Sequence, residues 1–123
     1  MSQETFTSRN LTLEVEDDGH TMRVGWLGKS TARDPGAFIA PLLSKALAHA
    51  RSVKRPLIMD FTRLEYMNSS TITPIIRILD EAKRTGLTVT VMYRQSLKWQ
   101  ELSFSALEIF QTQDGRIEIR GVD

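Results

Sequence analysis

The sequence contains no cysteine, only two histidines and no long apolar run. Without cysteine the chain cannot form a disulfide, a thiolate nucleophile or a cysteine–zinc site, and the cytoplasm is the compartment that we expect. No apolar stretch approaches the roughly 18 residues that a membrane-spanning helix needs. The polar start, MSQETFTSRN, lacks the apolar region of a signal peptide. We therefore expect a cytoplasmic protein that does not insert into a membrane.

An excess of charge of one sign is also missing, because 16 Lys and Arg face 15 Asp and Glu, for a net charge of +1. A nearly neutral chain gives no electrostatic reason to expect a nucleic-acid partner. With 123 residues, 41% hydrophobic and 25% charged, the chain has the size and composition of one ordinary globular domain. We assign residues 1–9 to a flexible N-terminus and residues 10–123 to the domain.

No constellation of residues in the sequence is typical of an active site. His20 lies beside a predicted hairpin and His49 on a predicted helix, so we interpret both as surface residues. Asp60 and Glu65 are conceivable as paired carboxylates, but an aspartate that closes a central strand is more often a structural hydrogen-bonding residue. No phosphate-loop motif G-x-x-x-x-G-K occurs. We predict a protein that is not an enzyme and has no metal site or cofactor.

Hydrophobic periodicity predicts strands that alternate with helices. Residues 10–28 alternate around an Asp17-Asp18-Gly19 turn and predict a β-hairpin. The continuous apolar run of residues 57–61 predicts a strand covered on both faces or central in a sheet, and residues 87–93 and 117–119 predict two more strands. The order ββαβαβαβ predicts one α/β domain with a mixed sheet of four to five strands and three to four helices mainly on one face.

Three helices are expected between these strands. The first starts at Asp34-Pro35, where aspartate caps and proline suits the first helical position. The second ends at Gly86. Ser96 caps the third, in which Trp99 and Leu102 face inward. Trp26 and Trp99 both lie at core-facing spacings, which favours packing over base stacking.

A basic cluster ends the first helix: Arg51, Lys54 and Arg55. These side chains either complement the helix dipole and remain solvated or form a binding patch.

Four small polar residues, Asn68-Ser69-Ser70-Thr71, separate the central strand from the second helix. In an open α/β sheet, ligands and partners dock outside the carboxyl ends of the strands. The same residue types are also preferred helix N-caps, and a purely structural cap is the alternative. Pro74 fits best in the first helical turn, which predicts a bend if the helix begins at Ser69, or else a start nearer Thr71.

Across nearly its whole length the chain resembles the STAS domain, the fold of bacterial anti-sigma factor antagonists. The matching segments are Asp60-Phe61-Thr62 at the strand end, Glu65-Tyr66-Met67 before the turn, and Asn68-Ser69-Ser70-Thr71 at the family's D-S-S-G or D-S-T-G motif. Residues 89–110, VTVMYRQSLKWQELSFSALEIF, look like the following strand, serine turn and helix. The resemblance implies a STAS-like single domain.

The resemblance implies a phosphorylation switch that acts on transcription. Family members bind a serine kinase that is also an anti-sigma factor, the kinase phosphorylates the first hydroxyl after the motif aspartate, and phosphorylation releases the complex. Ser69 is then the acceptor, with Ser70 and Thr71 as alternates, and a PP2C-type phosphatase reverses the step. The implied partner-binding residues are Asp60, Thr62, Asn68, Ser69, Ser70, Thr71 and Thr73.

Two residues depart from the motif. Asn68 stands in place of aspartate, which removes a negative charge beside the acceptor, and Thr71 in place of glycine, which adds a β-branched side chain where a partner approaches. The N-S-S-T version also resembles the SiaC-type phosphoproteins, whose motif has asparagine before its hydroxyl run. That branch implies a diguanylate cyclase as partner, with control by a kinase and a phosphatase and a role in biofilms. A third interpretation is an unphosphorylated interaction or ligand-sensing domain.

Overall fold

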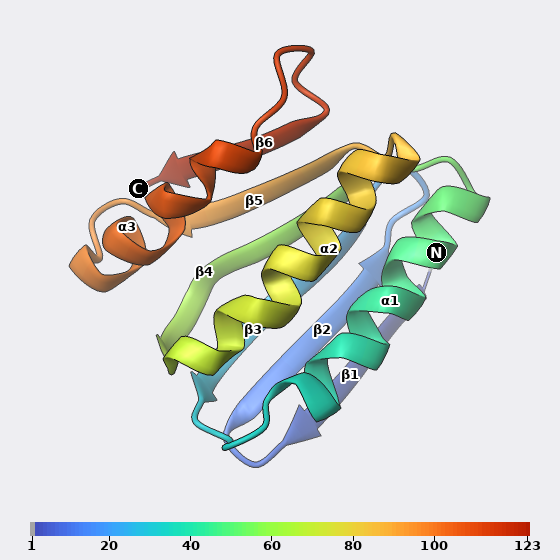
Figure 1. The fold of residues 1–123 in the computed structure, drawn as a ribbon. Helices are drawn as coiled ribbons and strands as arrows, with labels where there is room; N and C mark the ends of the chain where they lie inside the picture. Colours follow the sequence, from blue (N-terminus) through green and yellow to red (C-terminus); the bar gives the residue numbers. More distant parts are fainter. Residues whose placement is uncertain (1) are drawn as a thin grey trace.

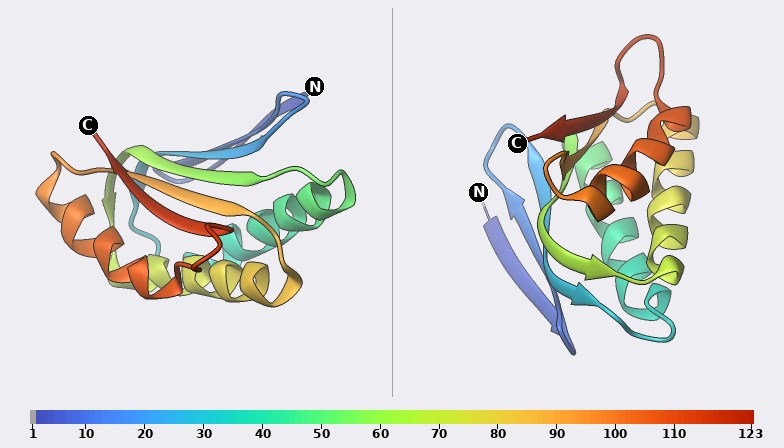
Figure 2. Two further views of the ribbon diagram at one scale, coloured as in Figure 1. Left: turned by 90° about the horizontal axis from the view of Figure 1, so that it is seen from above. Right: turned by 90° about the vertical axis from the view of Figure 1, so that its left-hand side faces the viewer.

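Six strands form one mixed sheet in chain order, and helices cover only one of its faces (Figures 1 and 2). The computed structural model describes residues 2–123. The strands are β1 (Ser2–Ser8), β2 (Leu11–Asp17), β3 (Met22–Ser30), β4 (Leu57–Met67), β5 (Val89–Arg94) and β6 (Ile117–Val122). The helices are α1 (Gly36–Ser52), α2 (Ile72–Thr85), α3 (Lys98–Ser105) and the short 3-10 helices η1 (Ser69–Thr71) and η2 (Ala106–Phe110). Strands β1 to β3 are antiparallel and β3 to β6 parallel.

The predicted α/β domain is confirmed, with one strand more than expected. Residues 1–9 were expected to be flexible, but Ser2–Ser8 forms the edge strand β1 beside β2. Its sequence is polar because most of its side chains are exposed, and only Phe6, opposite Leu13, carries a large apolar side chain toward the helices. A strand with one apolar inward residue lacks the alternation by which strands are recognised.

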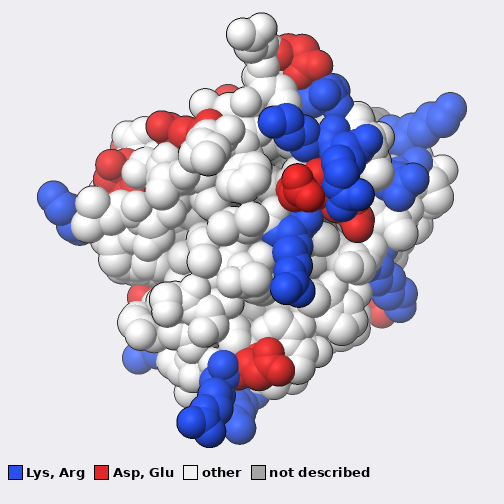
Figure 3. All heavy atoms as spheres, viewed as in Figure 1, with Lys and Arg blue, Asp and Glu red and all other residues white. Residues whose placement is uncertain are grey.

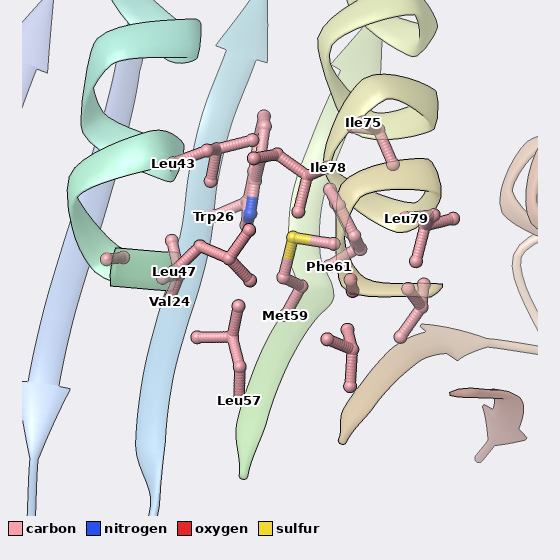
Figure 4. Packing of buried hydrophobic residues seen from close by; sticks show 14 of the residues in the cluster. Val24, Trp26, Leu43, Leu47, Leu57, Met59, Phe61, Ile75, Ile78 and Leu79 are labelled. Carbon is pink, nitrogen blue, oxygen red and sulfur yellow. The ribbon is translucent and has the colours of Figure 1, made fainter. Parts of the chain in front are cut away.

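The core lies between the sheet and helices α1 and α2 (Figure 4). Apolar residues three and four apart give each helix one buried face. The predicted packing role of Trp26 is confirmed, since the ring is fully buried and its centroid lies 4.6 Å from that of Phe61. Within residues 2–123 the Trp26 Nε1 has no hydrogen-bond partner, so packing holds the indole in place.

Strand β4 separates from β5 after Asp60, and Gln100 of α3 fills the gap. The pairing of β4 with β5 runs only from Leu57 to Asp60. Beyond it, the fully buried Gln100 donates from Nε2 to the carbonyls of Phe61 (2.6 Å) and Leu64 (2.9 Å). Its Oε1 accepts the Arg94 amide at 2.7 Å. One side chain thus replaces the missing strand contacts and lets β4 continue to Met67.

Helices α1 and α3 differ in detail from the helices that the sequence predicts. Helix α3 faces inward through Gln100 and Phe104, so Leu102 is 64% exposed and the prediction of an inward Leu102 is wrong. Trp99 is half-buried against Phe104. Ser96 does not cap α3, which begins at Lys98 with no side-chain cap bond. Asp34 likewise does not cap α1, whose N-cap position is Pro35.

Candidate functional site

Asn68 anchors the turn between β4 and α2 to the segment that precedes α1. Its Nδ2 donates to the Ala32 carbonyl at 2.8 Å, and its backbone amide donates to Ser30 at 2.9 Å. Its Oδ1 accepts from the Thr71 amide at 3.2 Å and from the Thr71 hydroxyl at 2.8 Å. Asn68 is therefore a helix N-cap that also ties two loops together.

Thr71 is an internal residue of the turn. Its side chain is fully buried, and its hydroxyl lies 2.6 Å from the hydroxyl of Ser30. Ser69 and Ser70, between the two anchors, are exposed, and their hydroxyls make no hydrogen bond within residues 2–123. The turn thus holds its ends inside the protein and presents two serines outside.

The start of α2 explains why Pro74 is tolerated. Residues Ser69–Thr71 form a 3-10 turn, and the α-helix begins at Ile72, close to the start near Thr71 that the sequence allowed. Pro74 is then the third residue of α2, inside the first turn, where no backbone N–H is needed. Gly86 ends the helix in the left-handed conformation with φ 73°, as predicted.

A hollow of about 360 Å³ opens beside the turn, between the beginnings of α1 and α2. We call it the arginine hollow, because Arg33 and Arg77 line it. The other lining residues are Ser70 of η1, Thr73 and Pro74 of α2, and Asp34, Pro35, Gly36 and Ala40. Ser69 is not part of its lining. The two exposed serines therefore face different surroundings.

Asp60 and Thr62, which the resemblance groups with the turn, belong to another surface. Leu57, Met59 and Phe61 of β4 point toward the helices, so the alternation of the strand directs Asp60 to the uncovered face. There Asp60 Oδ2 accepts from Arg23 at 2.8 Å, and Asp60 Oδ1 accepts from the Thr62 amide at 2.9 Å and the Thr62 hydroxyl at 2.6 Å.

These contacts make Asp60 a structural hydrogen-bonding residue, as expected. Glu65 is exposed and forms no ion pair with any described residue. Glu65 lies five positions after Asp60 on strand β4, and at about 3.3 Å per residue this separation is too large for paired carboxylates.

The basic cluster after α1 is partly used within the fold. Arg55 and His49 both contact the carboxylate of Asp17. The Gly19 amide first, and then His49 and Arg55, lower the pKa of Asp17. Arg51 and Lys54, with Arg55, line a separate hollow at the opposite end of α2. Figure 3 shows basic side chains along the helix-covered face with a few acidic ones among them.

Across residues 2–123 no group of three His, Asp or Glu side chains is placed to hold a metal ion. Over the same range, none of the helices is long and apolar enough to cross a membrane.

Neither a family model nor a curated protein matches the sequence. Solved structures do match it. SiaC of Pseudomonas aeruginosa aligns with a TM-score of 0.62 and 20% identity over 100% of this chain and 98% of that chain. The structure of the P. aeruginosa diguanylate cyclase SiaD in complex with its activator SiaC aligns with a TM-score of 0.62 and 21% identity over 95% of this chain and 99% of the matched one.

An uncharacterized protein of the DUF3478 family with a SpoIIAA-like fold, from Shewanella loihica, aligns with a TM-score of 0.54 and 17% identity, over 94% of this chain and 90% of that one. The 123-residue chain described above thus has a STAS-like fold. The fold that the sequence predicts is therefore confirmed. At these identities the likeness concerns the STAS-like architecture and not the roles of individual residues.

Sequence reasoning located the serine turn but missed Arg33, Arg77 and Gln100. Arg77 was detectable in principle, because it lies seven residues after Ser70 and hence on the same helical face. Arg33 was not, since its neighbourhood to the turn depends on how the segment before α1 folds back. Gln100 looked like an ordinary polar helix residue because its role depends on the gap between β4 and β5.

Proposed function

We propose that this protein is a non-enzymatic signalling module that binds a diguanylate cyclase and is switched by phosphorylation in the Ser69–Ser70 turn. One observation carries the proposal: the chain shares its fold along its full length with SiaC, which was solved in complex with the diguanylate cyclase SiaD as its activator.

The turn has the chemistry that such a switch needs. Ser69 and Ser70 are exposed and lack internal partners, so a kinase can reach either hydroxyl without unfolding the turn. By position in the motif Ser69 is the implied acceptor, and Ser70 is the alternate. Thr71 is a poor acceptor because phosphorylation would break its contacts with Asn68 and Ser30. A phosphate adds about −1.5 to −2 charge and repels a partner surface shaped for a neutral hydroxyl.

An anti-sigma factor kinase is the alternative partner, with a PP2C-type phosphatase to reverse the modification and transcription as the output. The serine turn at the end of β4 and the SpoIIAA-like fold support it. In either case the contact surface would include Asn68, Ser69, Ser70 and Thr73. Asp60 and Thr62 would contribute only if a partner also reached the uncovered face of the sheet. The remaining alternative is that the turn is not phosphorylated and the protein is an interaction or ligand-sensing domain.

Reconstitution separates these partners. The purified chain is titrated into each diguanylate cyclase of its own organism while the formation of the cyclic dinucleotide from GTP is followed, and into its anti-sigma factor kinases with ATP while intact mass is measured. Ser69→Asp and Ser70→Asp should weaken cyclase regulation, whereas Thr88→Asp, an exposed control at the other end of α2, should not. If no cyclase responds to the wild-type chain, the proposal fails. Phosphate transfer from an anti-sigma kinase would then favour the alternative.

A further inference from the structure

The arginine hollow contains two cations that the fold itself does not neutralise. Within residues 2–123, neither Arg33 nor Arg77 has a carboxylate oxygen within ion-pair distance, and Asp34, which also lines the hollow, pairs with neither. By contrast, Arg84, two turns further along α2, is paired with Asp80 at 3.3 Å. Guanidinium groups bind phosphate oxygens in a planar, bidentate geometry, so two of them at one hollow suit a doubly charged anion.

Of the two exposed serines, only Ser70 lines the arginine hollow. Ser70 at the centre of η1 is followed by Thr73 and Arg77 of α2 at spacings of three and four residues, and all three line the hollow beside the start of α1. Ser69 has Ile72 and Ile76 at the corresponding positions, which are apolar residues packed partly against the core. A phosphoryl group on Ser70 therefore meets arginine, and one on Ser69 meets isoleucine.

We propose that the arginine hollow receives a phosphoryl group carried by Ser70, with Arg33 and Arg77 holding its oxygens. A protein kinase transfers the γ-phosphoryl group of ATP to Ser70 Oγ, so that an O–P bond forms, ADP leaves and the hydroxyl proton is released. The biological use of this site rests on the switch proposed above. Its structural consequence is that the lining changes from net positive to net negative, which would turn a surface that attracts acidic partner segments into one that repels them.

The test places phosphoserine biosynthetically at position 70 of the full chain, and at position 69 in a matched sample. A ³¹P NMR titration then measures the second phosphate pKa, which is about 6 for an unperturbed phosphoserine. For phosphoserine 70 we expect a value lower by roughly half a unit or more, because nearby guanidinium groups favour the dianion. The double variant Arg33→Gln/Arg77→Gln should restore the ordinary value, whereas Arg84→Gln should leave the lowered one. Phosphoserine 69 should titrate near the ordinary value.

An ordinary pKa for phosphoserine 70, an equal shift for phosphoserine 69, or insensitivity to the Arg33 and Arg77 substitutions would each overturn the inference. Amide NMR spectra of the unphosphorylated variants check that both substitutions leave the fold intact, as expected for exposed side chains. The result is independent of the partner. A lowered pKa together with unchanged cyclase binding would support the phosphate site and refute the switch.

Discussion

Exchanging Asn68 for aspartate replaces a single NH₂ group with oxygen, and the structure predicts that this exchange destabilises the protein. Aspartate keeps an oxygen that accepts from the Thr71 amide and hydroxyl. Its second oxygen, however, faces the Ala32 carbonyl, which in the wild-type protein accepts from Asn68 Nδ2 at 2.8 Å. Losing that hydrogen bond and leaving the carbonyl without a donor costs about 1–3 kcal/mol. A negative charge at the start of a helix recovers about 0.3–1 kcal/mol. The expected net loss in the free energy of unfolding is about 1–2 kcal/mol.

Urea and thermal unfolding at pH 7 measure this loss, which corresponds to a melting temperature lower by roughly 4–8 °C for a chain of this size. Asn10→Asp is the matched control, because Asn10 is exposed and its side chain makes no hydrogen bond within residues 2–123. That variant should stay within about 0.5 kcal/mol of the wild type. If Asn68→Asp unfolds at the same urea concentration as the wild type, the amide of Asn68 does not anchor the turn and the reasoning is wrong.

Other substitutions test the supports of the fold. Gln100→Leu should lower the free energy of unfolding by about 2–4 kcal/mol, because it leaves the carbonyls of Phe61 and Leu64 and the Arg94 amide without partners, whereas Gln113→Leu on the surface should not. Gly28→Ala should be more destabilising in urea than Gly115→Ala: both glycines have positive φ, but only at Gly28 would a Cβ overlap a backbone oxygen, that of Asn10. Because the folded state lowers the pKa of Asp17, its charge stabilises the protein above the ordinary value of 3.8, and this contribution is lost as the pH falls through the lowered pKa. Asp17→Asn should therefore be less stable than the wild type at pH 7, and a stability gap that stays constant down to pH 2 would contradict this.

The parts of the fold that the sequence predicts correctly are those decided by local chemistry. Alternation in residues 10–28, the apolar run at residues 57–61 and the glycine at position 86 each specify their structure through nearby residues. Strand β1 and the orientation of α3 depend on distant partners instead. Ser2–Ser8 is a strand because β2 offers it an edge, and Leu102 points outward because Gln100 is needed inside.

In the candidate site, too, the sequence predicts what nearby residues determine and misses what distant residues determine. The sequence places the serines at a helix start, and there the structure agrees, because capping and the proline position are local effects. The family resemblance also grouped Asp60 and Thr62 with the turn. The register of β4 against β3 shifts after Gly25, and β4 runs on to Met67 before the turn begins, which leaves Asp60 bonded to Arg23 on the uncovered face. Neither the shift nor the extension follows from residue order alone.

The two departures from the STAS motif have a structural meaning in this chain. Aspartate at position 68 could not donate to Ala32, and glycine at position 71 could offer no hydroxyl to Ser30 or Asn68. Asparagine supplies the donor to Ala32 and threonine supplies the hydroxyl, and each adds a contact inside the protein rather than on the surface that a partner would meet. The substitutions therefore do not remove the chemistry of a switch from this turn. They stabilise its two ends from within, and Ser69 and Ser70 remain the exposed hydroxyls on which a kinase or a partner could act.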